Sequence, residues 1–496
     1  MPLTNAASII MNTGPYGRRR IAVLIATVAL ADFLVFKQSF GLNLFVLSIS
    51  LTAAVLLSAR KPPRPTKAAI HIGLSALAAA PLLEAPTVSG FLLAMAAVIL
   101  LALENAKLLP RRPSAIPLVF LRFMPSILTG LPKAYRRYSR AYSGRTIFGK
   151  ALKSFTGWLL PLGMSLIFLL LFSAANPLIE MGLYNIDLRF MLNLLDIGRL
   201  GFWLAAATFI CAVTRPRLVH TYKRPSITVA ADNPSISFLD RTALVRCLAI
   251  FNLLFGMQTM LDLIYLWGGA ELPAGMNHAE YAHRGAYPLV ATALLAAAFV
   301  LVAMRRGGPG DTSRLIRTLV IAWIVQNVLL CLSSILRLDL YVETYSLTHL
   351  RLAAGIWMGL VAVGLVFILL RIALQRSNEW LISMNLVSLA TVLYFGALFD
   401  SAGFIARFNV ENSLELARQG EPLDVRYLAS LGPAAIPAFD IYLSAIPDDG
   451  DKRQLAIFAR QRLALKIEAR SHGWRSWSYR TDRMENYLRT TALIER

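Results

Sequence analysis

Residues 352–371 read LAAGIWMGLVAVGLVFILLR, a stretch whose only charged side chain is the terminal Arg371. An α-helix rises 1.5 Å per residue, so about 20 apolar residues cross the hydrocarbon core of a bilayer. Runs of similar character and length recur along the chain, at 21–38, 41–58, 68–84, 87–105, 154–173, 197–214, 247–267, 286–304, 317–336 and 380–398. The sequence therefore predicts an all-α fold, a polytopic bundle of about eleven transmembrane helices, with ten to twelve as the range.

Composition points the same way. Of the 496 residues, 56% are hydrophobic and 16% are charged, against about 25% charged in an ordinary soluble domain. The mean hydropathy is +0.57. A soluble chain of this size cannot hide so much apolar surface inside its folded volume, whereas a bilayer solvates that surface directly.

The net charge of +22 is unevenly distributed. Residues 399–496 carry 14 Lys/Arg and 13 Asp/Glu, and residues 1–398 carry 36 and 15. The excess lies in short loops between apolar runs, as the positive-inside rule describes, and no basic stretch belongs to a nucleic-acid-binding module. We therefore expect a membrane protein with no nucleic-acid partner.

Lys and Arg also predict the orientation of the chain. Basic side chains precede the first span and follow every even-numbered span: Arg18, Arg19 and Arg20; Arg60, Lys61, Arg64 and Lys67; eleven in 105–153; Arg215, Arg217, Lys223 and Arg224; Arg305, Arg306, Arg314 and Arg317; Arg371 and Arg376. The loops after odd-numbered spans are short, mixed or acidic. This pattern places the N-terminus in the cytoplasm and, after eleven spans, the C-terminus in the periplasm.

The expected organisation has five parts. Residues 1–20 form a cytoplasmic segment, 21–105 hold four spans, 106–153 form a basic cytoplasmic loop, 154–398 hold seven spans, and 399–496 form a polar extramembrane region. Residues 115–131 and 177–195 mix apolar and charged residues, and we expect them to lie in the membrane interface. The first should favour anionic lipid at the cytoplasmic face. The alternative for residues 1–31 is a cleavable signal peptide.

The region after residue 398 is polar and mixed in charge. Residues 452–470 have apolar positions spaced by three to five, which predicts a helix. We expect a small helical unit that docks on the outer surface. The chain's three cysteines, Cys211, Cys247 and Cys331, all lie in apolar runs, so no disulfide framework is predicted.

Several stretches resemble a known family. The segments that carry the resemblance are His278-Ala-Glu-Tyr-Ala-His-Arg-Gly285, Arg337-Leu-Asp-Leu-Tyr341 with Tyr345–Arg351, Asp400 with Ile405–Val410, and Leu423–Leu428. Together they are similar to the bacterial multi-pass membrane proteins catalogued as domain of unknown function 4173 and its sister family 4153. The resemblance covers roughly residues 150–480. It implies residence in the bacterial inner membrane, and it brings no reaction.

The family-like segments suggest a polar site on the outer face. Its candidate members are Glu280, Tyr281, Arg284, Arg337, Tyr341, Arg351 and Asp400. We expect the loops 268–285 and 337–351 to pack together beneath the tail, with the arginines held by carboxylates. His278, Glu280 and His283 could also ligate zinc, but a spacing of five does not share one helix face well. Interfacial hydrogen bonding is the alternative, and no cofactor is predicted.

Asp262 is the best candidate for a polar site inside the membrane, because ionisable groups there are costly. Gln326 and Asn327 are its expected partners across the bundle. Two interpretations stay open, structural bonding between helices and a path for a proton or substrate.

Three functions remain compatible with the sequence. The first is a non-enzymatic envelope protein whose outer loops and tail engage a partner or sense the periplasm. The second is a carrier for a small or lipid-linked solute, along a path lined by Asp262, Gln326 and Asn327. The third is a membrane-embedded transferase with outer-face chemistry at Glu280, Arg284, Arg337 and Arg351.

Overall fold

The computed structural model describes residues 15–59, 63–142, 196–218, 241–268, 313–418, 421–446, 450–469 and 473–494, with residues 161, 164, 165, 168 and 295. Every regular element in this part of the chain is helical. The chain divides into two compact units. Unit 1 comprises residues 1–111, 115–222 and 471–479, and unit 2 comprises residues 112–114, 223–470 and 480–496. Each unit is described by itself.

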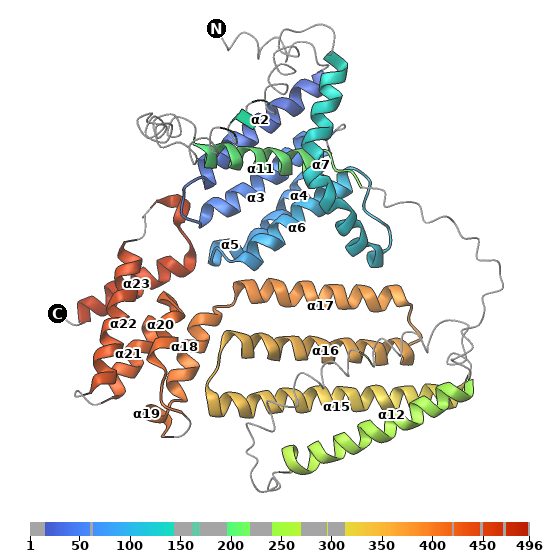
Figure 1. The fold of residues 1–496 in the computed structure, drawn as a ribbon, viewed down its shortest axis with the longest axis vertical. Coiled ribbons are helices and arrows are strands. Elements are labelled where there is room, and N and C mark those ends of the chain that lie inside the picture. Colours follow the sequence, from blue (N-terminus) through green and yellow to red (C-terminus); the bar gives the residue numbers. More distant parts are fainter. Residues whose placement is uncertain are drawn as a thin grey trace. The chain divides into compact units, whose positions relative to one another are not determined.

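Unit 1 is built from the N-terminal helices (Figure 1). They are α2 (Pro15–Val35), α3 (Leu42–Leu57), α4 (Pro65–Ala79), α5 (Pro81–Glu84), α6 (Val88–Asn105), α7 (Ile116–Tyr142, preceded by the 3-10 turn η1, Pro113–Ala115) and α11 (Ile197–Thr214). The 3-10 turn η5 (Trp474–Ser476) belongs to the same unit. A core of buried side chains from α3, α6, α7 and α11 holds these helices together.

Arginines close one end of unit 1. Arg19 donates to the Ala59 carbonyl just beyond α3, at 2.6 Å, and Arg20 donates to the carbonyls of Ser58 and Thr214. Cations stabilise helix C-termini, where carbonyls lack helical partners. The start of α2 and the ends of α3 and α11 therefore meet at one basic end.

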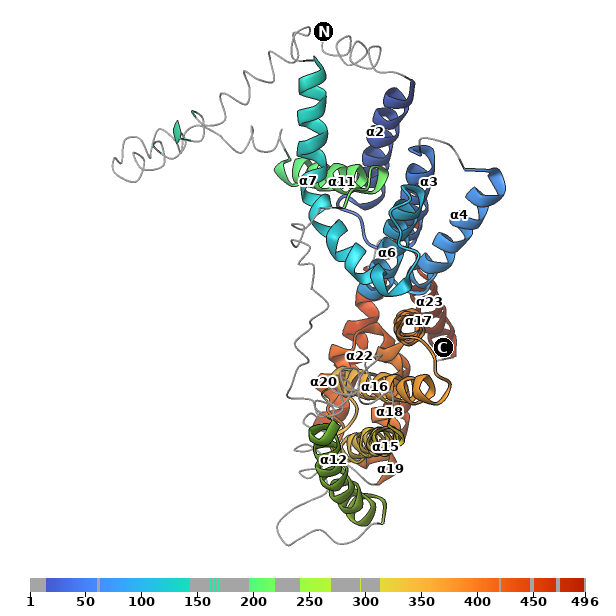
Figure 2. The ribbon, with the colours of Figure 1, turned by 90° about the vertical axis from the view of Figure 1, so that its right-hand side faces the viewer.

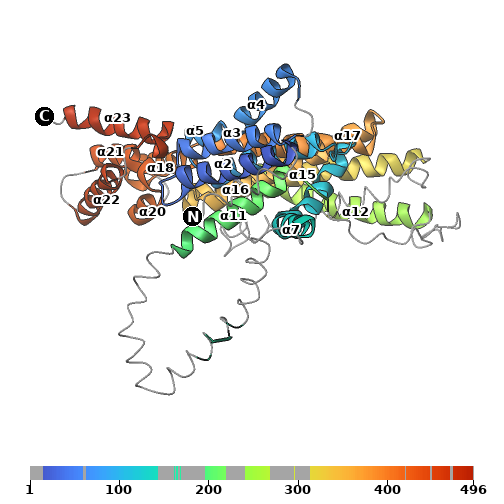
Figure 3. The same cartoon turned by 90° about the horizontal axis from the view of Figure 1, so that it is seen from above.

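Helix α7 lies across this end of the unit. Its buried residues Val119, Phe123 and Ser126 recur at helical spacing, and the first two join a core with Val55 near the end of α3 and Val213 near the end of α11. Figure 3 looks nearly along α7, whereas α2, α3 and α11 run across the same view. The exposed side of α7 carries Leu118, Leu121 and Arg122.

Unit 2 contains a bundle of long helices. They are α12 (Arg241–Asp262), extended by the π-helical turn η3 (Leu263–Trp267), α15 (Arg314–Tyr345), α16 (His349–Ala373) and α17 (Asn378–Leu398). Figures 1 and 2 show α15, α16 and α17 side by side. Short loops fix their antiparallel order, and the side chains of Thr348 and Ser377 cap the N-termini of α16 and α17.

Helices α12 and α15 run in the same direction. Asn252 donates to the Leu319 carbonyl at 3.0 Å, and Gln326 donates to the Asn252 carbonyl at 3.2 Å. Ten residues further along α12, Asp262 pairs with Arg337, eleven residues beyond Gln326. Contacts that advance together along both helices define a parallel pair.

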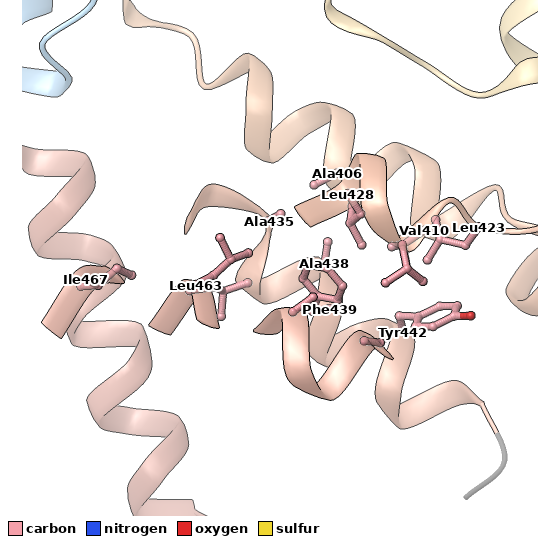
Figure 4. Close-up of a cluster of buried hydrophobic side chains, with 14 residues drawn as sticks. Ala406, Val410, Leu423, Leu428, Ala435, Ala438, Phe439, Tyr442, Leu463 and Ile467 are labelled. Carbon is pink, nitrogen blue, oxygen red and sulfur yellow. The ribbon is translucent and has the colours of Figure 1, made fainter. Parts of the chain in front are cut away.

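The tail folds into a helical cluster with its own core. Its helices are α18 (Ser401–Glu411), α19 (Leu414–Ala417), α20 (Val425–Ser430), η4 (Pro433–Ala435), α21 (Ile436–Ala445), α22 (Asp451–Glu468) and α23 (Tyr479–Ile494). Phe439 and Tyr442 are fully buried in this core with Val410, Leu428 and Leu463 (Figure 4). The predicted helix at 452–470 is confirmed as α22.

The predicted spans can be compared with these helices. Nine of the eleven fall on α2, α3, α4 with α5, α6, α11, α12 with η3, α15, α16 and α17. The other two, 154–173 and 286–304, and the interfacial segment 177–195 lie outside the described residues apart from single positions.

Length and apolar composition alone support fewer crossings. Six helical stretches meet both criteria among the described residues: Val88–Asn105, Pro113–Gly130, Arg241–Trp267, Arg314–Tyr345, His349–Ala373 and Asn378–Leu398. Leu42–Leu57 and Gly198–Thr214 are apolar but shorter. The described part of the chain is thus all-helical and of membrane type. These criteria give six candidate spans there, so they do not confirm the predicted count of about eleven. The segment 115–131, expected at the interface, overlaps one of the six, Pro113–Gly130.

Candidate functional site

A buried ion pair joins α12 and α15. The guanidinium of Arg337 binds the carboxylate of Asp262, and the two side chains are 3% and 1% exposed. Gln258, one turn earlier on α12, donates to the same carboxylate oxygen at 3.0 Å. Bringing either charge into an apolar seam without the other would cost several kcal/mol, so each requires its partner.

The helix changes character directly after Asp262. Residues Leu263–Trp267 form the π-helical turn η3, and the indole of Trp267 donates to the Ser333 hydroxyl at 3.1 Å. Such turns inside α-helices occur frequently at functional sites, because the widened turn redirects side chains and frees backbone groups. The turn therefore sets the last contacts of α12 against α15.

The expected partners of Asp262 are corrected by this geometry. Gln326 donates to the backbone carbonyl of Asn252, and Asn327 donates to the Trp323 carbonyl of its own helix at 2.7 Å. Neither bonds to the carboxylate. Arg337, expected in the outer-face site, takes that position instead, since a full positive charge neutralises Asp262 and an amide cannot.

Gln326 and Asn327 lie in the same seam, and the oxygen of each side-chain amide can still accept a hydrogen bond. Asn327 is fully buried, and its side-chain oxygen, like those of Asn252 and Gln326, meets no hydrogen-bond donor among the described contacts. Buried amide oxygens usually find a donor or an ordered water. The largely apolar α12–α15 seam thus contains buried amides as well as the Asp262–Arg337 pair towards one end.

The described members of the outer-face set do not converge on one point. Arg351 donates to the carbonyls of Tyr345 and Ser346, and its guanidinium lies 4.6 Å from the centre of the Tyr341 ring. This arrangement fastens the turn between α15 and α16. Arg337 is occupied by Asp262, so the arginine cluster expected for a transferase is divided between two separate tasks.

Asp400 serves the junction between α17 and the tail. Its side chain caps α18 by accepting from the Gly403 backbone N–H at 3.2 Å, and it pairs with Arg480 of α23 at 3.2 Å. Arg480 also donates to the Leu398 carbonyl, at the end of α17, at 3.3 Å. Asp400, two residues beyond the end of α17, is therefore tied to α23.

The tail also binds the turn at residues 346–348. Asn409 of α18 exchanges two hydrogen bonds with the Leu347 backbone, at 2.7 and 2.9 Å, and the Tyr427 hydroxyl accepts from the His349 N–H at 3.3 Å. Leu347, Val342 and Ile405 form a small core at this contact. The expected packing of the segment 337–351 beneath the tail is thus present in unit 2.

Glu280, Tyr281, Arg284, His278 and His283 lie outside the described residues. The structure therefore adds nothing to the zinc-like spacing or to the contact expected between the two outer loops. Within the part of the chain that is described, no three His, Cys, Asp or Glu side chains are grouped as metal ligands would be.

Other charged contacts were not predicted from the sequence. Asp32 is held by Arg199, with the guanidinium Nε 3.0 Å from a carboxylate oxygen, and by the indole of Trp203 at 2.9 Å. Glu104 pairs with Lys67 at 3.2 Å and with His71 at 3.3 Å. The sequence did contain one signal, an ionisable residue within an apolar run. Such a residue implies that a polar partner is present but does not identify it.

A second set of titratable groups lies inside the tail. Burial pushes the pKa of Glu415 upward, but hydrogen bonds from the Leu423 N–H and from Lys452 outweigh it, so the pKa lies below its ordinary value. Burial, together with the neighbouring Glu415 carboxylate, raises the pKa of Tyr442 to about 12. These groups fasten α19 to α21 and α22.

Residues 66–442 match the model of a family described as a domain of unknown function (DUF4153). This is the sister family named from the sequence motifs. No curated protein and no solved structure matches the chain.

Proposed function

The chain belongs to the DUF4153 family, whose description assigns no activity, and we propose from its own residues that it is a non-enzymatic envelope protein of the bacterial inner membrane. In this proposal the tail and the turns beneath it engage a partner or sense conditions on the periplasmic side. The segments that resemble domain of unknown function 4173 support kinship with that family as well.

The attachment of the tail within unit 2 carries this proposal. The tail binds the bundle through Leu347, His349 and Leu398, which lie where α15 and α17 end and α16 begins. The opposite end of the same bundle carries basic residues: Arg241 and Arg314 at helix starts, and Arg371 and Arg376 where α16 ends. Basic ends favour the cytoplasm, so this separation supports a periplasmic tail without relying on a count of spans.

The orientation of α7 supports the preferred count. The buried residues of α7, Val119 and Phe123, belong to a core cluster that includes Val55 near the end of α3 and Val213 near the end of α11. We therefore favour an interfacial α7, despite the apolar length of residues 113–130. Its basic flank then faces anionic lipid at the cytoplasmic surface.

Thiol labelling in spheroplasts tests the placement. With Cys211, Cys247 and Cys331 replaced by alanine, a single cysteine is introduced at the exposed Gln461 of α22 or at the exposed Arg376 beyond α16. A membrane-impermeant maleimide should label Gln461→Cys in sealed spheroplasts and Arg376→Cys only after lysis. Labelling in the reverse order would place the tail in the cytoplasm and remove the proposed function.

A carrier is the second candidate, and the buried polar groups between α12 and α15 favour it. Ionisable residues inside membrane bundles frequently mark substrate or proton paths. A variant with both Asp262→Asn and Arg337→Gln keeps the seam neutral. If the seam carries solute, this variant should reach normal abundance and fail to complement a deletion strain. Full complementation at normal abundance would assign the pair a structural role only.

A further inference from the structure

Unit 2 contains a cavity of about 220 Å³ between α18, α21 and α23. We propose that this cavity binds the phosphate group of an anionic phospholipid headgroup. The proposal rests on the proposed function, because it names the chemical class of the partner that the tail engages. It uses residues that none of the predicted sites includes, apart from Asp400.

The charges around the cavity select an anion. Arg407, Arg480 and Arg483 line it, and Asp400 is the single carboxylate in the lining. Glu411 binds Arg407 from outside the lining, with 2.6 Å between Nε and the carboxylate oxygen. The lining therefore carries three guanidinium groups and one carboxylate. Guanidinium groups suit phosphate because their planar N–H donors match its oxygens in pairs.

One arginine of the set is already held in position. Arg480 is 19% exposed and is fixed by Asp400 and by the Leu398 carbonyl. Arg407 and Arg483 lie on exposed positions at the rim. An anchored guanidinium reduces the entropy lost when a headgroup is captured, since this donor group needs no further ordering.

The position of the cavity favours a lipid over a soluble anion. Arg480 contacts Leu398, the last residue of α17, and Asp400 follows two residues later. If α17 spans the bilayer, its end lies at headgroup depth, where basic pockets on membrane proteins bind anionic lipids. Apolar side chains, including Ile441 and Met484, complete the walls and suit the glycerol and first acyl carbons.

The size of the cavity limits the ligand. Sites for drug-sized molecules measure roughly 300–1,000 Å³, so about 220 Å³ accommodates a headgroup and not a whole soluble cofactor. The acyl chains would remain outside, in the bilayer. The recognised chemistry is therefore a phosphate group whose hydrocarbon portion stays in the membrane.

Binding is measured on the full-length chain in neutral detergent by native mass spectrometry and by thermal shift. The probes are short-chain phosphatidylglycerol, phosphatidylcholine of the same chain length, and inorganic phosphate. The test variant is Arg407→Gln with Arg483→Gln, which removes two rim charges and leaves Arg480 in place. The matched control is Arg426→Gln with Arg462→Gln, two exposed arginines of the same tail that do not line the cavity.

Phosphatidylglycerol should bind more tightly than phosphatidylcholine, and the test variant should weaken it about tenfold or more while the control changes little. Equal loss in both variants, or no loss in the test variant, would overturn the proposal. Binding of inorganic phosphate as tight as that of the lipid would assign the cavity to a soluble anion instead. A detergent micelle does not separate a periplasmic from a cytoplasmic side. The binding results are therefore independent of the thiol labelling that tests the placement of the tail.

Discussion

The backbone N–H of Leu42 donates to the carbonyl of Trp477 at 2.7 Å, within unit 1. Leu42 begins α3, directly after the turn expected on the outer face, and Trp477 belongs to the tail. Arg475 adds a cation–π contact with Phe33, at 3.9 Å from the ring centre. The tail segment 473–479 therefore binds the end of unit 1 that lies opposite the basic end formed by Arg19 and Arg20. The contacts within unit 1 and those within unit 2 each support the proposed periplasmic position of the tail.

Gly41→Ala should loosen this contact. A Cβ at position 41 would lie 2.4 Å from the Ser476 carbonyl carbon and 2.5 Å from the Trp477 oxygen, both backbone atoms that cannot rotate away. We expect a loss of about 1–3 kcal/mol, the usual cost of overpacking, and faster proteolysis near residues 473–479. Thermal denaturation in detergent and limited proteolysis measure both effects.

The matched control is Gly73→Ala in α4, where an added Cβ meets nothing within 4 Å. Alanine in a helix interior should leave stability unchanged or raise it by up to about 1 kcal/mol. If both variants behave alike, the packing of segment 473–479 against Gly41 is not as described.

The Asp262–Arg337 pair predicts a rescue. Asp262→Asn or Arg337→Gln alone leaves a buried charge without its main partner, and each should cost about 3–5 kcal/mol and lower membrane abundance. The double variant should recover most of that loss, because no charge remains in the seam. Additive losses, with the double variant worse than either single one, would contradict direct pairing.

The parallel course of α12 and α15 predicts a further crossing between them. If both helices span the bilayer in one direction, the chain must return between residues 268 and 313, as the predicted span 286–304 would do. In the cysteine-free background, Ala279→Cys should react from the periplasmic face and Gly308→Cys from the cytoplasmic face. Reaction of both from one face would show that the chain does not cross there.

High pH should destabilise the tail through Tyr442. An unfolded tyrosine ionises near pH 10, whereas the pKa of Tyr442 is raised to about 12, so folding favours its neutral form. This contribution is complete below about pH 10 and is lost as pH rises towards about 12. Thermal denaturation of the full chain, followed across this range, should show a steeper decline than in Tyr442→Phe. Identical pH profiles would exclude Tyr442 as the cause.

The sequence was sufficient for the helical, membrane-type fold, since apolar runs of spanning length leave few alternatives. Its limits were in the pairing of side chains. Asp262 was identified as an intramembrane polar residue, but its partner Arg337 is 75 residues away and was assigned to a different site. Pairing depends on which helix faces pack together, and neither hydropathy nor charge counting contains that information.

Arg480 illustrates the same limit in the tail. It lies 80 residues after Asp400, and nothing in its local pattern distinguishes it from the neighbouring arginines of α23. Asn409 and Tyr427, by contrast, lay in segments already quoted for their family resemblance, and both hold the turn between α15 and α16. Motif similarity therefore found residues that fasten the tail, although it named no role for them.

Fusion reporters after Arg496 test the central claim, the periplasmic tail, most directly. Alkaline phosphatase is active only outside the cytoplasm, and a fluorescent protein that fails to fold after export reports the opposite side. The account predicts an active phosphatase fusion and a dark fluorescent fusion at comparable expression. An inactive phosphatase beside a bright fluorescent fusion would show that the tail is cytoplasmic and would contradict the account.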